Sequence, residues 1–157
     1  MRGRYTLLYI IGVAVVLLAA CDTSTVYFHY ERTSLSGWER NDTVIFAVPS
    51  VQQDGHYQEE VALCVGNNFP FRSVSLVIEQ TLLPSGRSWR DTLSCELADE
   101  IGNATGGGVG RYQYCFPLRN LQLSQGDSLH IRLRHDMKRE ILPGFSDVGF
   151  RLTRVKP

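Results

Sequence analysis

Apolar and aromatic residues alternate with polar ones through most of the chain after residue 21, and clusters of turn residues interrupt this alternation. Successive side chains of a β-strand point to opposite faces, so each alternating run predicts a strand with one buried face. Breaks such as Pro84-Ser85-Gly86 and Ser124-Gln125-Gly126-Asp127 contain residues typical of tight turns. The eight predicted strands are Val26–Glu31, Thr43–Val48, Tyr57–Val65, Val74–Thr81, Trp89–Leu97, Arg111–Leu118, Ser128–His135 and Val148–Arg154.

About eight short strands joined by turns favour an all-β fold, a single β-sandwich domain of antiparallel strands. Only the segment Asp136–Ile141 is predicted to be helical, as one short turn near the C-terminus. Pro143-Gly144 should then turn the chain into the last strand, because proline fixes φ and glycine tolerates positive φ.

The same period of two predicts which side chains form the core. Within each strand, the apolar residues that share one face are expected to be buried between the sheets. They are Val74, Leu76 and Ile78; Trp89, Leu93, Cys95 and Leu97; Tyr112, Tyr114 and Phe116; Leu129, Ile131 and Leu133; and Val148, Phe150 and Leu152.

The N-terminus has the layout of a bacterial lipoprotein signal peptide. Arg2 and Arg4 precede Tyr5–Leu18, an uncharged and mostly apolar run that is too short to span a bilayer comfortably. Leu18-Ala19-Ala20-Cys21 follows and matches a lipobox. We therefore expect residues 1–20 to be removed and residues 21–157 to form the mature domain. Cys21 would be acylated and would anchor the protein to a membrane.

Asp22 bears on the destination of the lipoprotein. An acid after the lipidated cysteine retains lipoproteins in the inner membrane of some bacteria, although that rule is not universal. The sequence has no acidic run of the kind that directs lipoproteins to the cell exterior. The expected location is the cell envelope, on the periplasmic side of the outer membrane.

Composition and charge narrow the class of protein. A hydrophobic content of 43% is that of a folded chain rather than a disordered one. Loss of Arg2 and Arg4 with the leader gives the mature chain a formal charge of −2, which argues against a nucleic-acid partner.

Three cysteines remain after the lipobox, namely Cys64, Cys95 and Cys115. The oxidising envelope permits a disulfide, but an odd number leaves at least one thiol unpaired within a monomer. Strand parity places Cys95 inside and favours Cys64 and Cys115 if any two pair. Three separate thiols are at least as consistent with the sequence.

No catalytic, cofactor or metal motif is recognisable. The histidines His29, His56, His130 and His135 lack metal-site spacing, and Glu59 and Glu60 should point to opposite faces of their strand. The glycine-rich segment 102–110 lacks the lysine and the following helix of a phosphate loop, so it is interpreted as a sheet corner. We expect no cofactor.

Arginines on the last two predicted strands suggest a docking surface. Arg132 and Arg134 oppose Leu129, Ile131 and Leu133, and Arg151 opposes Phe150 and Leu152. If these strands are neighbours, the three arginines share one outer face, which could bind a protein partner. A merely solvated face is the alternative, because arginine outnumbers lysine throughout the chain.

Several separated motifs occur in an order typical of one family. They are Val26-Tyr27; Trp38 with Asn41-Asp42-Thr43; Asn68-Phe69-Pro70-Phe71; Asp91-Thr92 with Cys95-Glu96-Leu97-Ala98; Gly106-Gly107-Gly108-Val109-Gly110; Met137; Leu142-Pro143-Gly144; and Asp147-Val148-Gly149. In this order the chain resembles the GldH family of gliding-motility lipoproteins. It departs from the family pattern at Asn103-Ala104-Thr105, Cys64-Val65-Gly66 and Arg111.

The resemblance implies an accessory lipoprotein of the gliding apparatus, which is associated with the type IX secretion system. It implies no enzymatic activity, and the expected partners are the membrane, through the N-terminal lipid, and envelope proteins of that apparatus. The alternative is a carbohydrate-binding lipoprotein that stacks sugars on exposed aromatics, and a periplasmic hydrolase is the third candidate. The aromatic candidates for sugar binding are Trp38, Trp89, Tyr57 and Tyr27.

Overall fold

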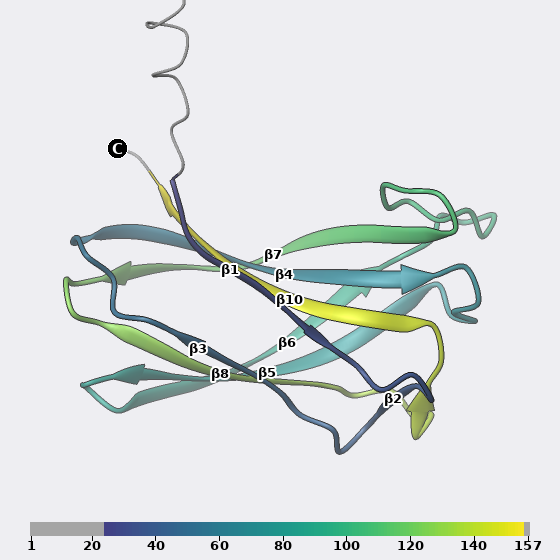
Figure 1. Ribbon diagram of the computed structural model, residues 1–157, viewed down its shortest axis with the longest axis horizontal. Helices are drawn as coiled ribbons and strands as arrows, with labels where there is room; N and C mark the ends of the chain where they lie inside the picture. Colours follow the sequence, from purple (N-terminus) through teal and green to yellow (C-terminus); the bar gives the residue numbers. More distant parts are fainter. Residues whose placement is uncertain (1–23, 156–157) are drawn as a thin grey trace, which may run out of the picture.

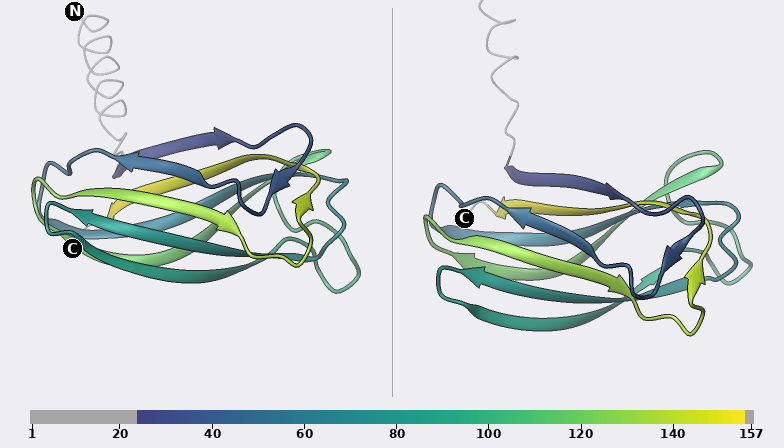
Figure 2. Two further views of the ribbon diagram at one scale, coloured as in Figure 1. Left: turned by 90° about the horizontal axis from the view of Figure 1, so that it is seen from below. Right: turned by 60° about the horizontal axis from the view of Figure 1, so that its bottom comes forward.

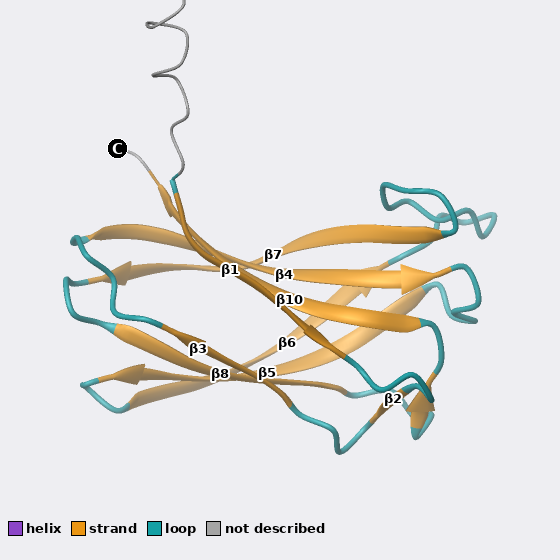
Figure 3. Cartoon of the chain, viewed as in Figure 1, coloured by secondary structure: helices purple, strands orange, loops and turns teal. Residues whose placement is uncertain are grey.

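The computed structural model describes residues 24–155 and folds them into two stacked four-stranded sheets (Figure 1). The predicted signal peptide, residues 1–20, and Cys21 lie outside the described residues. Figure 3 shows strands and loops in this part of the chain, and residues 24–155 contain no apolar helix of membrane-spanning length. The strands are β1 (Thr25–Arg32), β2 (Trp38–Glu39), β3 (Val44–Val48), β4 (Gly55–Gly66), β5 (Ser73–Leu83), β6 (Arg87–Glu96), β7 (Arg111–Leu123), β8 (Ser128–His135), β9 (Ile141–Leu142) and β10 (Phe145–Val155).

The two sheets are antiparallel throughout. The first sheet has the order β1-β10-β4-β7 and the second has the order β3-β8-β5-β6. The two views in Figure 2 show them as separate layers, with a small ribbon of β2 and β9 at one end. All eight predicted strands are confirmed, and the all-β sandwich is confirmed with them.

The core fills the space between the layers. Val74, Leu76 and Ile78 of β5 are fully buried, as are Val148, Phe150 and Leu152 of β10, so the predicted faces of these strands are confirmed. Phe46 of β3 contacts Phe150 across the two sheets, with 5.9 Å between the ring centroids. Burial is less complete along the edge strands β6 and β7: Cys95, Leu97 and Tyr114 are buried, whereas Trp89, Leu93, Tyr112 and Phe116 are partly buried.

The predicted helical turn at Asp136–Ile141 is wrong. The segment bends and then forms β9, in which Leu142 pairs with Trp38 and Ile141 pairs with Glu39. Trp38 and Leu142 are both fully buried. A helix of one or two turns has little stability of its own, so the burial of these two side chains decides the backbone conformation here.

The turn after β9 follows the prediction. Gly144 has φ of +87° and its carbonyl oxygen accepts a 2.7 Å hydrogen bond from the Gly66 amide. A Cβ atom at this position would lie 2.8 Å from Asn68 Oδ1 and 3.0 Å from the Phe69 nitrogen. Both the positive φ and the close approach therefore require glycine.

The three cysteines of the described chain are free thiols, so Cys64 and Cys115 are not bonded to each other. The register explains the separation. Cys64 pairs with Gln113, and Cys115 pairs with Ala62, which makes the two cysteines diagonal neighbours on adjacent strands. Diagonal pairs lie farther apart than the ~4 Å between Cβ atoms that a disulfide needs.

We predict that Gly144→Ala lowers the free energy of unfolding by about 2–3 kcal/mol, because it combines an unfavourable φ with a steric clash. Gly86→Ala is the matched control. Gly86 also has positive φ, +72°, but no atom lies within 4 Å of the added Cβ position. Urea denaturation should show the smaller loss for Gly86→Ala, and equal losses would contradict the role of the close approach.

Candidate functional site

The structure separates the three arginines that the sequence placed on one face. β8 and β10 belong to different sheets. Arg132 and Arg134 lie on the outer face of the second sheet, whereas Arg151 lies on the outer face of the first sheet. The expectation of a single three-arginine face is therefore wrong, because strands that are close in sequence at the C-terminus are not neighbours in either sheet.

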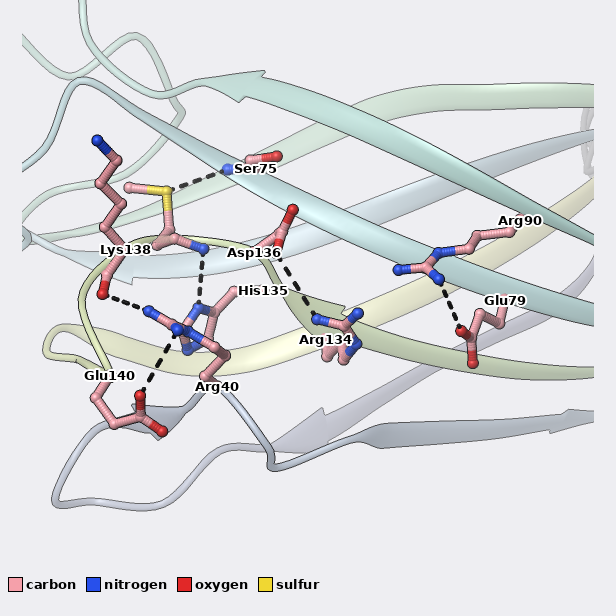
Figure 4. A network of polar contacts seen from close by, with 10 residues as sticks. Arg40, Ser75, Glu79, Arg90, Arg134, His135, Asp136, Lys138 and Glu140 are labelled. Carbon is pink, nitrogen blue, oxygen red and sulfur yellow. Dashed lines mark hydrogen bonds and ion pairs between the residues drawn. The ribbon is translucent and has the colours of Figure 1, made fainter.

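Arg132 and Arg134 instead share their face with an arginine of β6. Glu79 of β5 is directly opposite Arg132 on one side and Arg90 on the other, so all three side chains emerge from the same face. We call Arg90, Arg132 and Arg134 the arginine face. Figure 4 shows two of these arginines, Arg90 and Arg134, beside Glu79 and Asp136.

The ion pairs of the arginine face are loose. Arg90 Nη1 lies 3.8 Å from Glu79 Oε1, and Arg134 Nη1 lies 3.9 Å from Asp136 Oδ1. Within residues 24–155, Arg132 has no carboxylate within 4.0 Å. A hollow of about 420 Å³ lies beside Arg132 and is also lined by Glu79 and Thr81 of β5. The face therefore carries an unpaired positive charge next to a recess.

A network at the end of β8 fixes the backbone of the segment that contains Arg134 and Asp136. The buried His135 donates from Nε2 to the Trp38 carbonyl oxygen at 3.1 Å. Its Nδ1 accepts a 3.4 Å hydrogen bond from the Met137 amide, which is the dashed line that ends on His135 in Figure 4. Burial lowers the pKa of His135, which favours the neutral ring that this pair of bonds requires. Arg40 bonds to the Lys138 carbonyl oxygen and so ties the β2 end of the chain to the same segment.

Arg151 has a different environment. Its Nε donates to Glu60 Oε2 at 2.7 Å, and its guanidinium group lies over the Phe28 ring, 5.3 Å from the centroid. The hydrogen bond from Arg151 to Glu60 raises the pKa of Arg151. Phe28 also packs against Tyr30 at 5.0 Å between centroids. Because its charge is already paired, Arg151 is less available to a partner than Arg132 is.

The aromatic candidates for sugar binding do not form an exposed platform. Trp38 and Tyr57 are buried, and each uses its polar atom internally. Trp89 is partly buried, with the guanidinium groups of Arg87 and Arg119 at 5.8 and 5.3 Å from its ring. Tyr27 packs against the core. These positions give no support to a stacked sugar ring.

A polar cluster that the strand pattern alone did not reveal lies between the sheets near β6 and β7, partly buried at Arg119 and Asp91 and fully buried at Glu59 and Gln80. Arg119 donates to Asp91 at 2.7 Å, and Gln80 Nε2 donates to Glu59 Oε2 at 3.1 Å. Glu59 is fully buried, and its Oε1 has no hydrogen-bond partner. The signal was present in the sequence, because Glu59 has the same parity as Val61 and therefore points inward.

Burial raises the pKa of Glu59 to about 7, against the smaller opposing effects of Gln80 and Arg119. Desolvation penalises the carboxylate more than the neutral acid. No group of three or more metal-ligating side chains occurs among residues 24–155, and Glu59 and Glu60 lie on opposite faces of β4. The cluster is thus a titratable element of the core.

These features define an all-β sandwich with charged outer faces and one polar region inside. The model of the GldH lipoprotein family matches residues 25–152, so the chain belongs to the GldH lipoprotein family. The gliding motility lipoprotein GldH of Flavobacterium johnsoniae is 29% identical over 150 residues, which covers 91% of this chain and 93% of that protein. The family resemblance seen in the sequence is thereby confirmed.

Two solved structures are more distantly similar. A protein from Sulfurospirillum deleyianum is 9% identical, with a TM-score of 0.41 over 83% of this chain and 99% of that chain. The subviral particle protein VP2 of infectious bursal disease virus is 10% identical, with a TM-score of 0.37 over 82% of this chain and 30% of that chain.

We predict that the stability of the protein falls as pH rises from about 4.5 to about 7 because of Glu59. Its folded-state pKa is raised above the ordinary value of 4.5, so the folded state binds the proton more tightly than the unfolded state. The loss should be complete above about pH 7, and it should amount to about 3 kcal/mol. The measurement is the free energy of unfolding in urea at a series of pH values.

Glu59→Gln should remove most of this pH dependence. Compared with the wild type at the same pH, its free energy of unfolding should therefore be more favourable at about pH 8 than at about pH 5. Glu96→Gln changes an exposed carboxylate on β6 and should retain the slope of the wild-type protein. Identical slopes for Glu59→Gln and wild type would show that Glu59 is not the responsible group.

Proposed function

We propose that this protein is a non-enzymatic docking component of the gliding machinery and of the type IX secretion system associated with it. Membership in the GldH lipoprotein family supports the gliding role. The arginine face supports docking: its three arginines have two carboxylates beside them, Glu79 and Asp136, so the face keeps an excess positive charge beside a recess. The partner is an envelope protein with an acidic surface.

Attachment to the membrane is the first part of the proposal. Cys21 carries the lipid, residues 1–20 are removed, and the mature protein resides on the periplasmic side of the outer membrane. The lipobox Leu18-Ala19-Ala20-Cys21 and the lipoprotein family support this assignment. Acyl chains anchor a protein because each buried methylene contributes about 0.8 kcal/mol.

Metabolic labelling with a fatty acid tests the anchor. Wild-type protein should incorporate the label and sediment with the outer membrane after the two membranes are separated. Cys21→Ala should lose the label, because Cys21 is the only cysteine within the lipobox Leu18-Ala19-Ala20-Cys21. Label retained by Cys21→Ala would show that the acylated residue lies elsewhere.

The physical basis of docking is the planar guanidinium group. Exposed arginines contribute little to folding because water and salt screen their ion pairs. At an interface they lose water and form paired, bidentate hydrogen bonds with carboxylates, which are about twice as strong as neutral ones. The arginine face can therefore contribute to binding at small cost to the fold.

We predict that Arg132→Glu/Arg134→Glu yields a folded, lipid-anchored protein whose co-purification with envelope partners falls at least tenfold. Arg111→Glu reverses an exposed charge on the other sheet and should leave co-purification unchanged. Thermal denaturation checks that all variants are folded, and Arg132→Gln/Arg134→Gln replaces the double glutamate variant if that one unfolds.

Quantitative mass spectrometry after crosslinking in the native cell reads out the partners. Loss of the same partners from Arg132→Glu/Arg134→Glu and from its glutamine version would support docking through this face. Undiminished recovery with both versions would show that the arginine face is only solvated.

A further inference from the structure

A hollow lies at the end of the sandwich where the described chain begins. It has a volume of about 430 Å³, which is within the range of small-molecule binding pockets. Its apolar lining comes from Val26 of β1, Val48 of β3, Tyr57 of β4 and the loop residues Pro49 and Val51. Val48, Val51 and Tyr57 are buried, whereas Val26 is 45% exposed, so the floor is continuous with the core.

The walls of this hollow are held by hydrogen bonds. Tyr57 donates from its hydroxyl group to the Gln53 carbonyl oxygen at 2.7 Å. Arg154 donates to the Asp54 carbonyl oxygen at 3.1 Å and also bonds to the Gln53 side chain. The Val51 amide donates to the Asp127 carbonyl oxygen at 2.8 Å. The loop between β3 and β4 is therefore fixed, and the hollow is preformed.

The lipobox cysteine lies close to this hollow along the chain. Ser24 lines the hollow, and its carbonyl oxygen accepts a 2.7 Å hydrogen bond from the Arg154 amide. Cys21 precedes Ser24 by three residues, which span at most about 10 Å. A lipid attached to Cys21 is therefore tethered within reach of an apolar recess.

We propose that the hollow binds one acyl chain of the lipid attached to Cys21. This inference rests on the lipid anchor proposed above. The recess offers an apolar lining to a hydrocarbon chain, and a short tether raises the local concentration of that chain far above that of a free lipid. A lipobox cysteine receives a diacylglycerol on its thiol and a third acyl chain on its amine, so two chains remain in the bilayer, and two are sufficient for stable anchoring.

An occupied hollow would fix the orientation of the sandwich. The β1 start and the β10 end lie side by side at this end of the molecule (Figure 1). An acyl chain that enters the hollow at Val26 holds this end against the bilayer surface. A tether of three residues alone would leave the domain free to rotate.

Photocrosslinking tests the proposal. Cells that make the full protein are fed a fatty acid carrying a diazirine and are then irradiated. The protein is purified and digested, and the crosslinked peptides are identified by mass spectrometry. We expect crosslinks that join the lipidated Cys21 peptide to peptides containing Val26 or Val51. Crosslinks from the Cys21 lipid to other positions alone would overturn the proposal.

The anchor and the hollow can fail separately. Absence of the label from Cys21 would refute the proposed lipid anchor, and with it the proposal that an acyl chain of Cys21 occupies the hollow. Label on Cys21 without crosslinks to the hollow would refute only the occupant. A second experiment uses the unlabelled lipoprotein in phosphatidylethanolamine vesicles that contain a diazirine phospholipid. Crosslinking of that phospholipid to residues of the hollow would show that the hollow binds a bilayer lipid instead, which would overturn the proposal.

A matched pair of variants controls for the position of the tether. Val26→Arg places a charge on the wall of the hollow and should lower the crosslink yield about tenfold. Val155→Arg changes a side chain of similar exposure, 44%, near the same chain end, but Val155 does not line the hollow. Its crosslink yield should equal that of the wild type, and an equal loss in both variants would contradict the assignment.

Discussion

The register of β10 against its two neighbours is the constraint on which the rest of the structure depends. β10 lies between β1 and β4 and supplies Val148, Phe150 and Leu152 to the core. A slip by one residue would move every side chain of the strand to the opposite face. It would bury Arg151 and expose Phe150, so the apolar face of β10 also determines which charges the first sheet presents outside.

The polar cluster near β6 and β7 is the part of the interior that does not follow the apolar rule. β6 and β7 are edge strands of different sheets, and Arg119 of β7 bonds to Asp91 of β6. Both side chains keep part of their contact with water, at 35% and 24% exposed, so the pair contributes little to stability. Glu59 adds a buried carboxyl whose pKa is raised to about 7. Burial therefore favours the neutral form of Glu59 over its carboxylate.

The strands could be predicted from the sequence because alternation is a local property of each segment. Their arrangement could not, since pairing between strands depends on contacts across the whole chain. This is why Arg132 and Arg151 were expected on one face and lie on two. The ribbon of β2 and β9 has two residues in each strand, too few for any alternation, and its stability comes from the burial of Trp38 and Leu142.

The candidate site was only partly predictable for the same reason. Arg132 and Arg134 could be assigned to an outer face from the apolar residues between them, but Arg90 joins them only through the pairing of both β6 and β8 with β5. Glu59 could have been assigned to the interior from its parity with Val61. The expectation for this pair was only that Glu59 and Glu60 point to opposite faces of the strand, which does not say which of the two is buried.

The two proposed surfaces are compatible in a single orientation of the domain. The hollow and the β1 start are at one end of the sandwich, and β8 runs from that end toward the ribbon of β2 and β9 at the other (Figures 1 and 2). Arg134 is one residue from the end of β8, so it lies toward the end away from the lipid. A domain held at the bilayer by its lipid would then present the arginine face to the side and away from the anionic headgroups that would otherwise compete for it.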